Sequence, residues 1–145
     1  MFFAFLFYMN EVVIQKELSL DPSEFIDVLN RSTLGERRPV DDFSRIKKMC
    51  ENANLIVTAR LDEKLIGVAR SINDFTYCTY LSDLAVDKDY QKRGIGKKLI
   101  EETKKQAPQA KLILLSAPAA IDYYPKIGMK KHNHCFILDD VSELK

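Results

Sequence analysis

Hydrophobic and polar positions recur along nearly the whole chain with spacings that predict both strands and helices. Residues 11–18 alternate around Val12 and Ile14, as a half-buried strand does. Two apolar runs, 55–61 and 65–72, are separated by a short polar turn, which is typical of a β-hairpin. Further strands are predicted at residues 76–86, 111–115 and 135–138. The run at 111–115 is continuously apolar, which favours a strand covered on both faces.

Helix-start signals separate these strands. Asp21 can cap the free amides of a helix, and Pro22 fits its first position, so we predict a helix from there to about Asn30. The remaining helices are predicted at residues 41–52, 94–106 and 116–124. The order β, α, α, three β, α, β, α, β predicts a mixed α/β (α+β) fold. Its central sheet is mostly antiparallel, with parallel neighbours late in the chain.

Composition and charge narrow the class of protein. The chain has 145 residues, of which 46% are hydrophobic and 30% charged, so we expect one globular domain spanning residues 1–145. The 22 basic and 21 acidic residues give a net charge of +1. Bulk attraction to nucleic acid is therefore not expected, and any basic function has to come from a local patch.

The cysteines indicate a reducing compartment. Cys50, Cys78 and Cys135 are odd in number and widely spaced, which disfavours a disulfide scaffold and makes a cytoplasmic protein the expectation. Cys50 and Cys78 are expected to be buried. His132 and His134 share a strand face that Cys135 does not, so no metal site is predicted.

The first nine residues are uncharged and strongly apolar. They lack the basic start of a signal peptide, and they are far shorter than the roughly 20 residues that span a bilayer. We interpret them as a disordered or mis-started extension, with Met9 as an alternative start, and expect no membrane partner.

Residues 84–98 carry the strongest chemical signal. A buried strand ends there, a polar loop follows, and Gly94 and Gly96 open a helix, whose free N-terminal amides can bind an anion. Residues 88–105 hold seven Lys or Arg against three Asp or Glu, a local charge of +4. Leu99 breaks the dinucleotide pattern GxGxxG, and Gln91 breaks the Walker pattern. The glycines alone would equally suit a tight turn.

The arrangement Gln91-x-x-Gly94-x-Gly96 after the strand YLSDLAV resembles the pyrophosphate loop of the GNAT superfamily, the acyl-coenzyme A-dependent N-acyltransferases. The runs KLILLSAPAA and DYYPKIGM are similar to later elements of that family. The resemblance covers roughly residues 11–138 and implies a sheet in which two central strands splay apart.

The resemblance implies acetyl-CoA as co-substrate. The loop amides of Gln91, Lys92, Arg93, Gly94, Ile95, Gly96 and Lys97 would hold its pyrophosphate. Leu84, Ala85 and Val86 would pair with the pantetheine arm as an added strand does, because a bulge frees main-chain groups there.

The resemblance also implies direct attack of a primary amine on the thioester. Tyr124 stands four residues before Gly128, as the family's general acid does, and Tyr123 is the reserve because Pro125 disfavours a helical Tyr124. Asp83 is a candidate base for the proton of the amine. The alternative is that Asp83 is a structural strand residue held in a salt bridge.

The loop after the first helix corresponds to the family's acceptor wall. Arg37 and Arg38 in it would suit a carboxylate or phosphate on the acceptor, although a solvated pair is the simpler interpretation. Arg70 and Asp74, near the end of the third strand, are weaker candidates for contacts with the acceptor.

We therefore expect an N-acetyltransferase acting on a small molecule or a protein. The alternatives are a non-catalytic acyl-CoA sensor of the same fold and a polyanion-binding domain that uses the basic patch. The oligomeric state stays open, with a homodimer joined at sheet edges as one expectation.

Overall fold

The computed structural model describes residues 10–145, which fall into two compact units divided after Leu115. The interpretation of residues 1–9 as a disordered or mis-started extension lies outside the described residues. Whether the two units behave as one domain stays a prediction.

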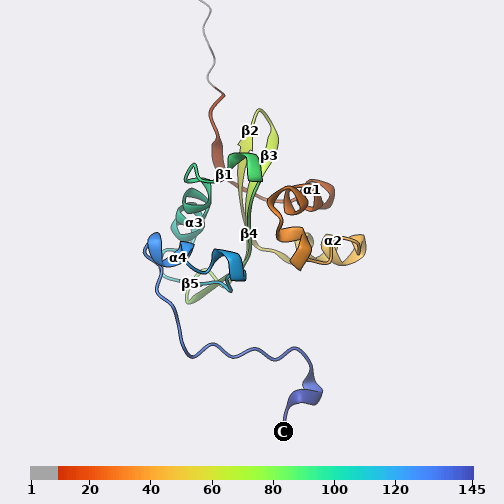
Figure 1. Ribbon diagram of the computed structural model, residues 1–145, viewed down its shortest axis with the longest axis vertical. Helices are drawn as coiled ribbons and strands as arrows, with labels where there is room; N and C mark the ends of the chain where they lie inside the picture. The colour runs from red at the N-terminus through yellow and green to blue at the C-terminus, as the bar shows by residue number, and fades with distance from the viewer. Residues whose placement is uncertain (1–9) are drawn as a thin grey trace, which may run out of the picture. The chain divides into compact units, whose positions relative to one another are not determined.

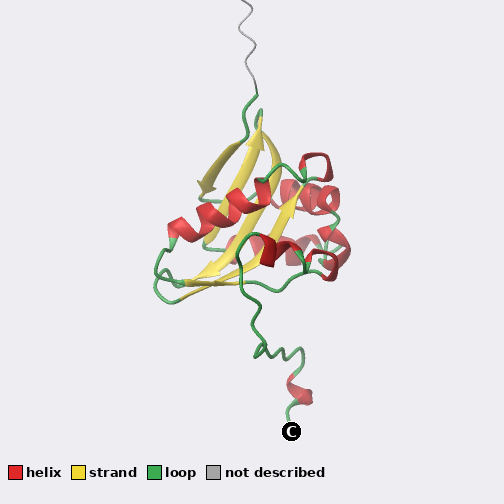
Figure 2. Cartoon of the chain, turned by 60° about the vertical axis from the view of Figure 1, so that its left-hand side comes forward, coloured by secondary structure: helices red, strands yellow, loops and turns green. Residues whose placement is uncertain are grey.

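The first unit is built on a five-stranded sheet with the strand order β1-β2-β3-β4-β5 (Figure 2). The first four strands run antiparallel to their neighbours, and β5 runs parallel to β4. The strands are β1 (Val13–Glu17), β2 (Leu55–Leu61), β3 (Lys64–Asn73), β4 (Cys78–Val86) and β5 (Lys111–Ile113). The predicted mixed, mostly antiparallel sheet is confirmed.

Helices cover both faces of this sheet. The helices α1 (Pro22–Ser32) and α2 (Phe43–Asn52) lie on one face, and α3 (Ile95–Gln106) lies on the other (Figure 1). The predicted cap at Asp21 is confirmed: its carboxylate accepts hydrogen bonds from the N–H groups of Ser23 and Glu24, both at 2.9 Å. At the start of α2, the Asp42 carboxylate accepts the N–H of Arg45 at 3.0 Å.

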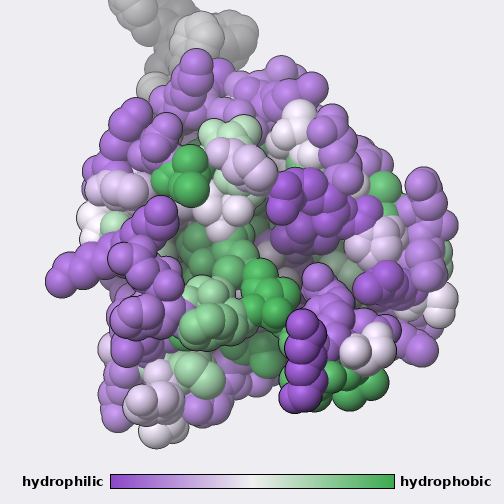
Figure 3. All heavy atoms as spheres, turned by 60° about the horizontal axis from the view of Figure 1, so that its bottom comes forward, coloured by the Kyte–Doolittle hydropathy of each residue, from purple (hydrophilic) through white to green (hydrophobic). Residues whose placement is uncertain are grey.

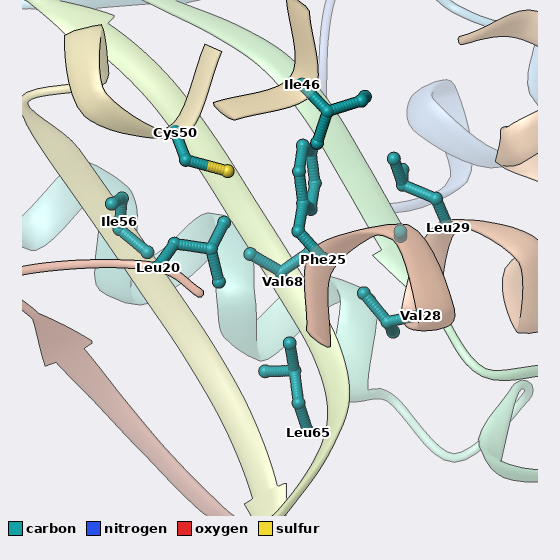
Figure 4. Packing of buried hydrophobic residues seen from close by; sticks show 10 residues of the cluster. Leu20, Phe25, Val28, Leu29, Ile46, Cys50, Ile56, Leu65 and Val68 are labelled. Carbon is teal, nitrogen blue, oxygen red and sulfur yellow. The ribbon is translucent and has the colours of Figure 1, made fainter. Parts of the chain in front are cut away.

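Two apolar clusters hold the helices to the sheet. On the α1/α2 face, Phe25, Leu29 and Ile46 are fully buried against Val68 of β3 (Figure 4). Each such side chain contributes about 1.5–3 kcal/mol through its removal from water. On the other face, Leu99 packs so closely on the sheet that a Cβ at Gly67 would lie 3.1 Å from its Cδ1 atom. The sheet is thereby a rigid base for the loops at its ends.

A β-bulge interrupts the pairing of β4 with β3. Arg70 pairs with Asp83 and Ser71 pairs with Leu81, so Ser82 is left without an opposite residue. The extra residue shifts the alternation of side chains by one. Leu81 therefore packs on the α3 face, whereas Ala85 packs on the α1/α2 face. The bulge that the family resemblance implied in this strand is present.

Two predictions for the end of the chain are wrong. The strand expected at 135–138 is absent, and Phe136 there is 91% exposed. The strand expected over residues 111–115 ends at Ile113, which is 47% exposed and so not covered on both faces. An apolar run becomes a covered strand only where a neighbouring element supplies hydrogen bonds and packing, and the sequence pattern does not contain that neighbour.

The second unit carries short elements in place of the predicted helix at 116–124. These are η3 (Pro118–Ala120), α4 (Tyr123–Lys126) and η4 (Val141–Glu143).

Candidate active site

The loop after β4 presents unused backbone donors. The 3-10 turn η2 (Lys88–Tyr90) follows β4, and positive φ angles at Lys92 (62°) and Gly94 (78°) then direct the chain into α3. The first helical hydrogen bond runs from the N–H of Lys98 to the carbonyl of Gly94, at 3.1 Å. Within residues 10–145, the N–H groups of residues 92–97 donate no hydrogen bond to the protein. Six successive amides are therefore available to an anion.

The side chains of this loop are exposed and basic. Lys92, Arg93 and Lys97 all face solvent, and the guanidinium of Arg93 lies 5.3 Å from the ring centre of Tyr90. The side-chain amide of Gln91 instead donates to the carbonyl of Val86, at 2.8 Å. Gln91 thus holds the loop against the end of β4.

The strands β4 and β5 stop pairing well before β4 reaches this loop. Their pairing consists of three residue pairs and ends at Tyr80 with Ile113, while β4 continues for six residues to Val86. The N–H of Asp87 bonds to the carbonyl of Ile66 in β3, at 2.8 Å. Backbone groups alternate in an antiparallel ladder, so those of Leu84 and Val86 point away from β3 and into the gap. The two strands separate as the resemblance implied, but β5 is the edge strand of the described sheet, so the separated pair is not central.

A partly buried ion pair joins the loop after β4 to α1. Arg31, at the end of α1, contacts Asp87 through Nη1 and donates to the carbonyl of Leu65 through Nη2, at 2.7 Å. Asp87 is 3% exposed and accepts the N–H of Asp89 at 2.9 Å. Burial alone would raise the pKa of Asp87, but these two hydrogen bonds outweigh it and lower the pKa below its ordinary value.

The lowered pKa of Asp87 predicts acid sensitivity. A depressed folded-state pKa adds stability above the unfolded value near 4 and loses it as the pH falls through the folded value. We expect Arg31→Gln to lower the free energy of unfolding by about 1–3 kcal/mol at pH 7, because a buried carboxylate loses a charged donor. Urea unfolding from pH 7 to pH 3 checks this. The difference in free energy of unfolding between wild type and variant should become smaller toward pH 3. A difference that stays constant with pH would contradict the assignment.

Asp83 lies at the centre of a second buried ion-pair cluster. It is fully buried, and Oδ2 contacts Nε of Arg70 at 2.5 Å while Oδ1 contacts Nε of Arg38. Arg70 also donates to the carbonyl of Met49, at 3.1 Å, and Arg38 donates to the carbonyl of Ser82, at 2.8 Å. The geometry favours the salt-bridged role over that of a base, because both carboxylate oxygens are engaged by cations.

This cluster separates the two predicted acceptor residues. Arg38 is directed into the sheet and braces the bulge, whereas Arg37, on the turn η1 (Leu34–Arg37), is exposed. Within residues 10–145 no ion pair or hydrogen bond engages the Arg37 guanidinium. Sequence spacing could not distinguish the two, since adjacent arginines look alike until the bulge brings Asp83 under one of them.

Tyr124 belongs to the second unit. It lies in α4, and burial raises the pKa of its phenol, with a smaller contribution from Tyr123. The two rings meet edge to face at 5.3 Å. Pro125 does not push Tyr124 out of the helix, because it occupies the first turn, where a backbone N–H is not needed.

The histidines and cysteines take no part in a visible metal site. Among residues 10–145 no group of three or more His, Cys, Asp or Glu side chains is placed to share a metal ion. All three cysteines are free. Cys50 is buried as predicted, which raises the pKa of its thiol to about 11, but the prediction that Cys78 is buried is wrong. Cys78 lies at the start of β4, beyond the cover of α1 and α2.

Comparison with known proteins decides the family. The model of the acetyltransferase (GNAT) family matches residues 23–129. The chain belongs to the GNAT family. Over 102 residues it is 26% identical to the N-acetyltransferase ycf52 of Pyropia yezoensis, a match that covers 66% of this chain and 57% of that protein. It spans 28% to 57% of the length of five curated relatives that it resembles.

Solved structures share the GNAT fold. A GNAT acetyltransferase of Streptococcus pneumoniae has a TM-score of 0.72 at 16% identity, over 90% of this chain and all of that one. An aminoglycoside N-acetyltransferase, AAC(6')-Iy, solved with CoA, has a TM-score of 0.69 at 14% identity, over 90% and 95% of the two chains. Within residues 10–145, no helix combines the length and apolar character needed to cross a bilayer.

Proposed function

We propose that this GNAT protein transfers the acetyl group of acetyl-CoA to a primary amine. The observation that carries the proposal is the run of free amides over residues 92–97, on a basic loop beside a strand that parts from its neighbour. Such a run, at the start of α3 and with its dipole, suits a diphosphate. Gln91 contributes by fixing the loop to Val86.

The same geometry supports a place for the pantetheine arm. Both backbone groups of Leu84 and the N–H of Val86 face the gap between β4 and β5, where an amide-rich ligand can pair with them as an added strand, while the Val86 carbonyl accepts the side chain of Gln91. The backbone groups of Ala85 instead pair with Val68 of β3, and its side chain packs in the core. The solved relative with bound CoA is consistent with this use of the fold.

The reaction follows from the chemistry of an amine and a thioester. The neutral amine nitrogen forms a bond to the acyl carbon, the C–S bond breaks, and the electron pair leaves on the CoA sulfur. The amine loses a proton to water, and the departing thiolate takes one from an acid. We assign that acid to Tyr124, whose raised pKa keeps the phenol protonated at neutral pH.

We assign Asp83 to holding the bulge rather than to accepting the amine's proton. Its carboxylate lies between the guanidinium groups of Arg38 and Arg70, which engage both of its oxygens and leave neither free for the amine's proton. Arg37, with its exposed guanidinium, is the better placed of the two predicted acceptor contacts. Three free cysteines support a reducing compartment such as the cytoplasm.

The test compares Gly94→Ala with Gly128→Ala. Both glycines have positive φ, 78° and 96°, and neither has an atom within 4 Å of the position a Cβ would take. Each substitution should therefore lower the free energy of unfolding by about 1 kcal/mol through backbone strain. The two variants should show similar drops in Tm. Only the methyl group at Gly94 would stand where the diphosphate binds, so we expect calorimetry to show a Kd for acetyl-CoA at least tenfold weaker for that variant.

Absence of acetyl-CoA binding to the wild type at millimolar concentration would overturn the proposal, as would equal Kd values for the two variants. A thiol-release assay with a panel of primary amines tests turnover. Binding without thiol release from any amine would favour the sensor.

A further inference from the structure

Two arginines from different elements hold the bulge residue Ser82. Its carbonyl accepts a hydrogen bond from Nη2 of Arg38 at 2.8 Å, and its hydroxyl accepts one from Nη2 of Arg70 at 3.0 Å. Ser82 has no opposite residue in the pairing of β3 with β4, so the ladder does not fix its peptide groups. The two guanidinium groups supply that constraint instead.

The helical cover of this face of the sheet becomes incomplete next to the bulge. Ile72 lies two residues after Arg70 on the same face and pairs with Tyr80. These two side chains are 45% and 40% exposed. Figure 3 looks toward the end of the molecule where β5 lies and shows hydrophobic side chains exposed among hydrophilic ones. Hydrogen bonds from side chains therefore hold the strand where packing on this face gives out.

The two arginines differ in what depends on them. Arg70 lies in β3 with its side chain 7% exposed, and it contacts Asp83 at 2.5 Å. Arg38 comes from the loop between α1 and α2, where its Nη1 donates to the carbonyl of Arg37 at 2.9 Å. If Arg38 is changed, Asp83 still has the cation of Arg70. The carbonyl of Ser82, in contrast, has Arg38 as its donor.

The Ser82 carbonyl is close along the chain to the backbone assigned to the coenzyme arm. Leu84 follows two residues later, and its N–H and carbonyl face the gap between β4 and β5. A rotation of the peptide group at Ser82 changes the direction of the donors that follow it. Because a misplacement of about 1 Å near a reacting group can cost about 10²-fold in rate, the hold on Ser82 bears on the chemical step.

We infer that Arg38 is a positioning residue for acetyl transfer. Through the carbonyl of Ser82 it fixes the direction in which the Leu84 backbone meets the acyl end of the coenzyme. The diphosphate is bound separately, by the amides of residues 92–97. Loss of the Arg38 guanidinium should therefore lower kcat and change the affinity for acetyl-CoA little. This inference rests on the proposed function and adds a residue to it.

Arg38→Lys is the test, because it keeps a positive charge beside Asp83 but loses the planar fork. One ammonium nitrogen cannot occupy the three positions from which the guanidinium reaches Asp83, Ser82 and Arg37. In the thiol-release assay, with acetyl-CoA and the amine that the wild type uses fastest, we expect kcat to fall at least tenfold. The Kd for acetyl-CoA from calorimetry should stay within threefold, and Tm within about 4 °C. The exposed Arg45→Lys is the matched control and should keep all three values.

Arg38→Ala with added guanidinium separates positioning from folding. Guanidinium chloride at tens of millimolar, far below the molar concentrations that unfold proteins, should raise kcat of this variant at least threefold by entering the vacated site. Sodium chloride at the same concentration should not. Absence of this rescue would overturn the inference, because a side chain needed only for folding is not replaced by a small ion in solution.

Other outcomes overturn the inference and leave the transferase intact. These are an unchanged kcat in Arg38→Lys, a Kd that weakens as much as kcat falls, and loss of folding in both variants. Absence of thiol release from the wild type with every amine would instead overturn the proposed function, and the role of Arg38 with it.

Discussion

Replacing Asp83 by Ala is expected to lower the free energy of unfolding by about 3–5 kcal/mol, the usual cost of removing one partner from a buried ion pair. The carboxylate is fully buried, and the Arg70 side chain is only 7% exposed. Without Asp83, the charges of Arg70 and Arg38 stay in the protein with no anion to compensate them. Urea unfolding of the wild type and the variant measures the loss.

Two further variants identify the cause of that loss. Asp139→Ala removes an exposed carboxylate and should change stability by less than about 0.5 kcal/mol. The double variant Asp83→Leu with Arg70→Met removes both charges and should recover much of the stability lost in Asp83→Ala, because no charge of Arg70 is left buried. A double variant no more stable than Asp83→Ala would contradict the ion-pair explanation.

The same position distinguishes a brace from a base. A catalytic base at Asp83 would make Asp83→Asn stable but slow and would remove the acidic limb of the pH–rate profile. If Asp83 only stabilises the bulge, Asp83→Asn should be less stable than the wild type. Its remaining activity should keep the acidic limb of the pH–rate profile. A stable, slow Asp83→Asn with no acidic limb would restore the catalytic assignment.

Tyr124→Phe is expected to lower kcat by about 10²–10⁴-fold, the range of a lost general acid. The variant keeps the ring and its edge-to-face contact with Tyr123, so folding and the Kd for acetyl-CoA should change little. Burial raises the pKa of Tyr124, so wild-type activity should persist through neutral pH and fall only as the phenol ionises above pH 10. Thiol-release assays between pH 7 and pH 11 measure the loss of kcat in the variant and the fall of wild-type activity at high pH.

Tyr123→Phe is the matched control for this prediction. It removes the neighbouring hydroxyl from the same helical turn and should leave kcat within about threefold of the wild type. A larger loss in Tyr123→Phe than in Tyr124→Phe would transfer the acid role to Tyr123. Equal, small losses in both would mean that solvent protonates the thiolate.

Much of the first unit could be predicted from local signals. Asp21 and Asp42 cap their helices as their residue types indicate, since a helix start needs only a nearby oxygen for its free amides. The hairpin of β2 and β3 follows from two apolar runs around a short turn. Gly94 marks the start of α3 because few other residues accept its positive φ.

Other features depended on contacts between distant segments. Asp83 could be a base or a brace until the bulge at Ser82 turned it toward Arg38 and Arg70. Cys78 was expected in the core as a small apolar residue, yet it is exposed at the start of β4. The segment 135–138 has the composition of a strand but no partner strand in the structure.

The sequence by itself determined most elements of the first unit, the capped helices and the glycine loop whose amides we propose to bind the diphosphate. These depend on spacing and backbone preference within a few residues. Only the tertiary structure decided where the pairing of β4 with β5 ends and how Asp83 pairs with two arginines. The physical reason is that strand register and burial are set by residues up to tens of positions apart, so a one-residue bulge can reverse which face a side chain occupies.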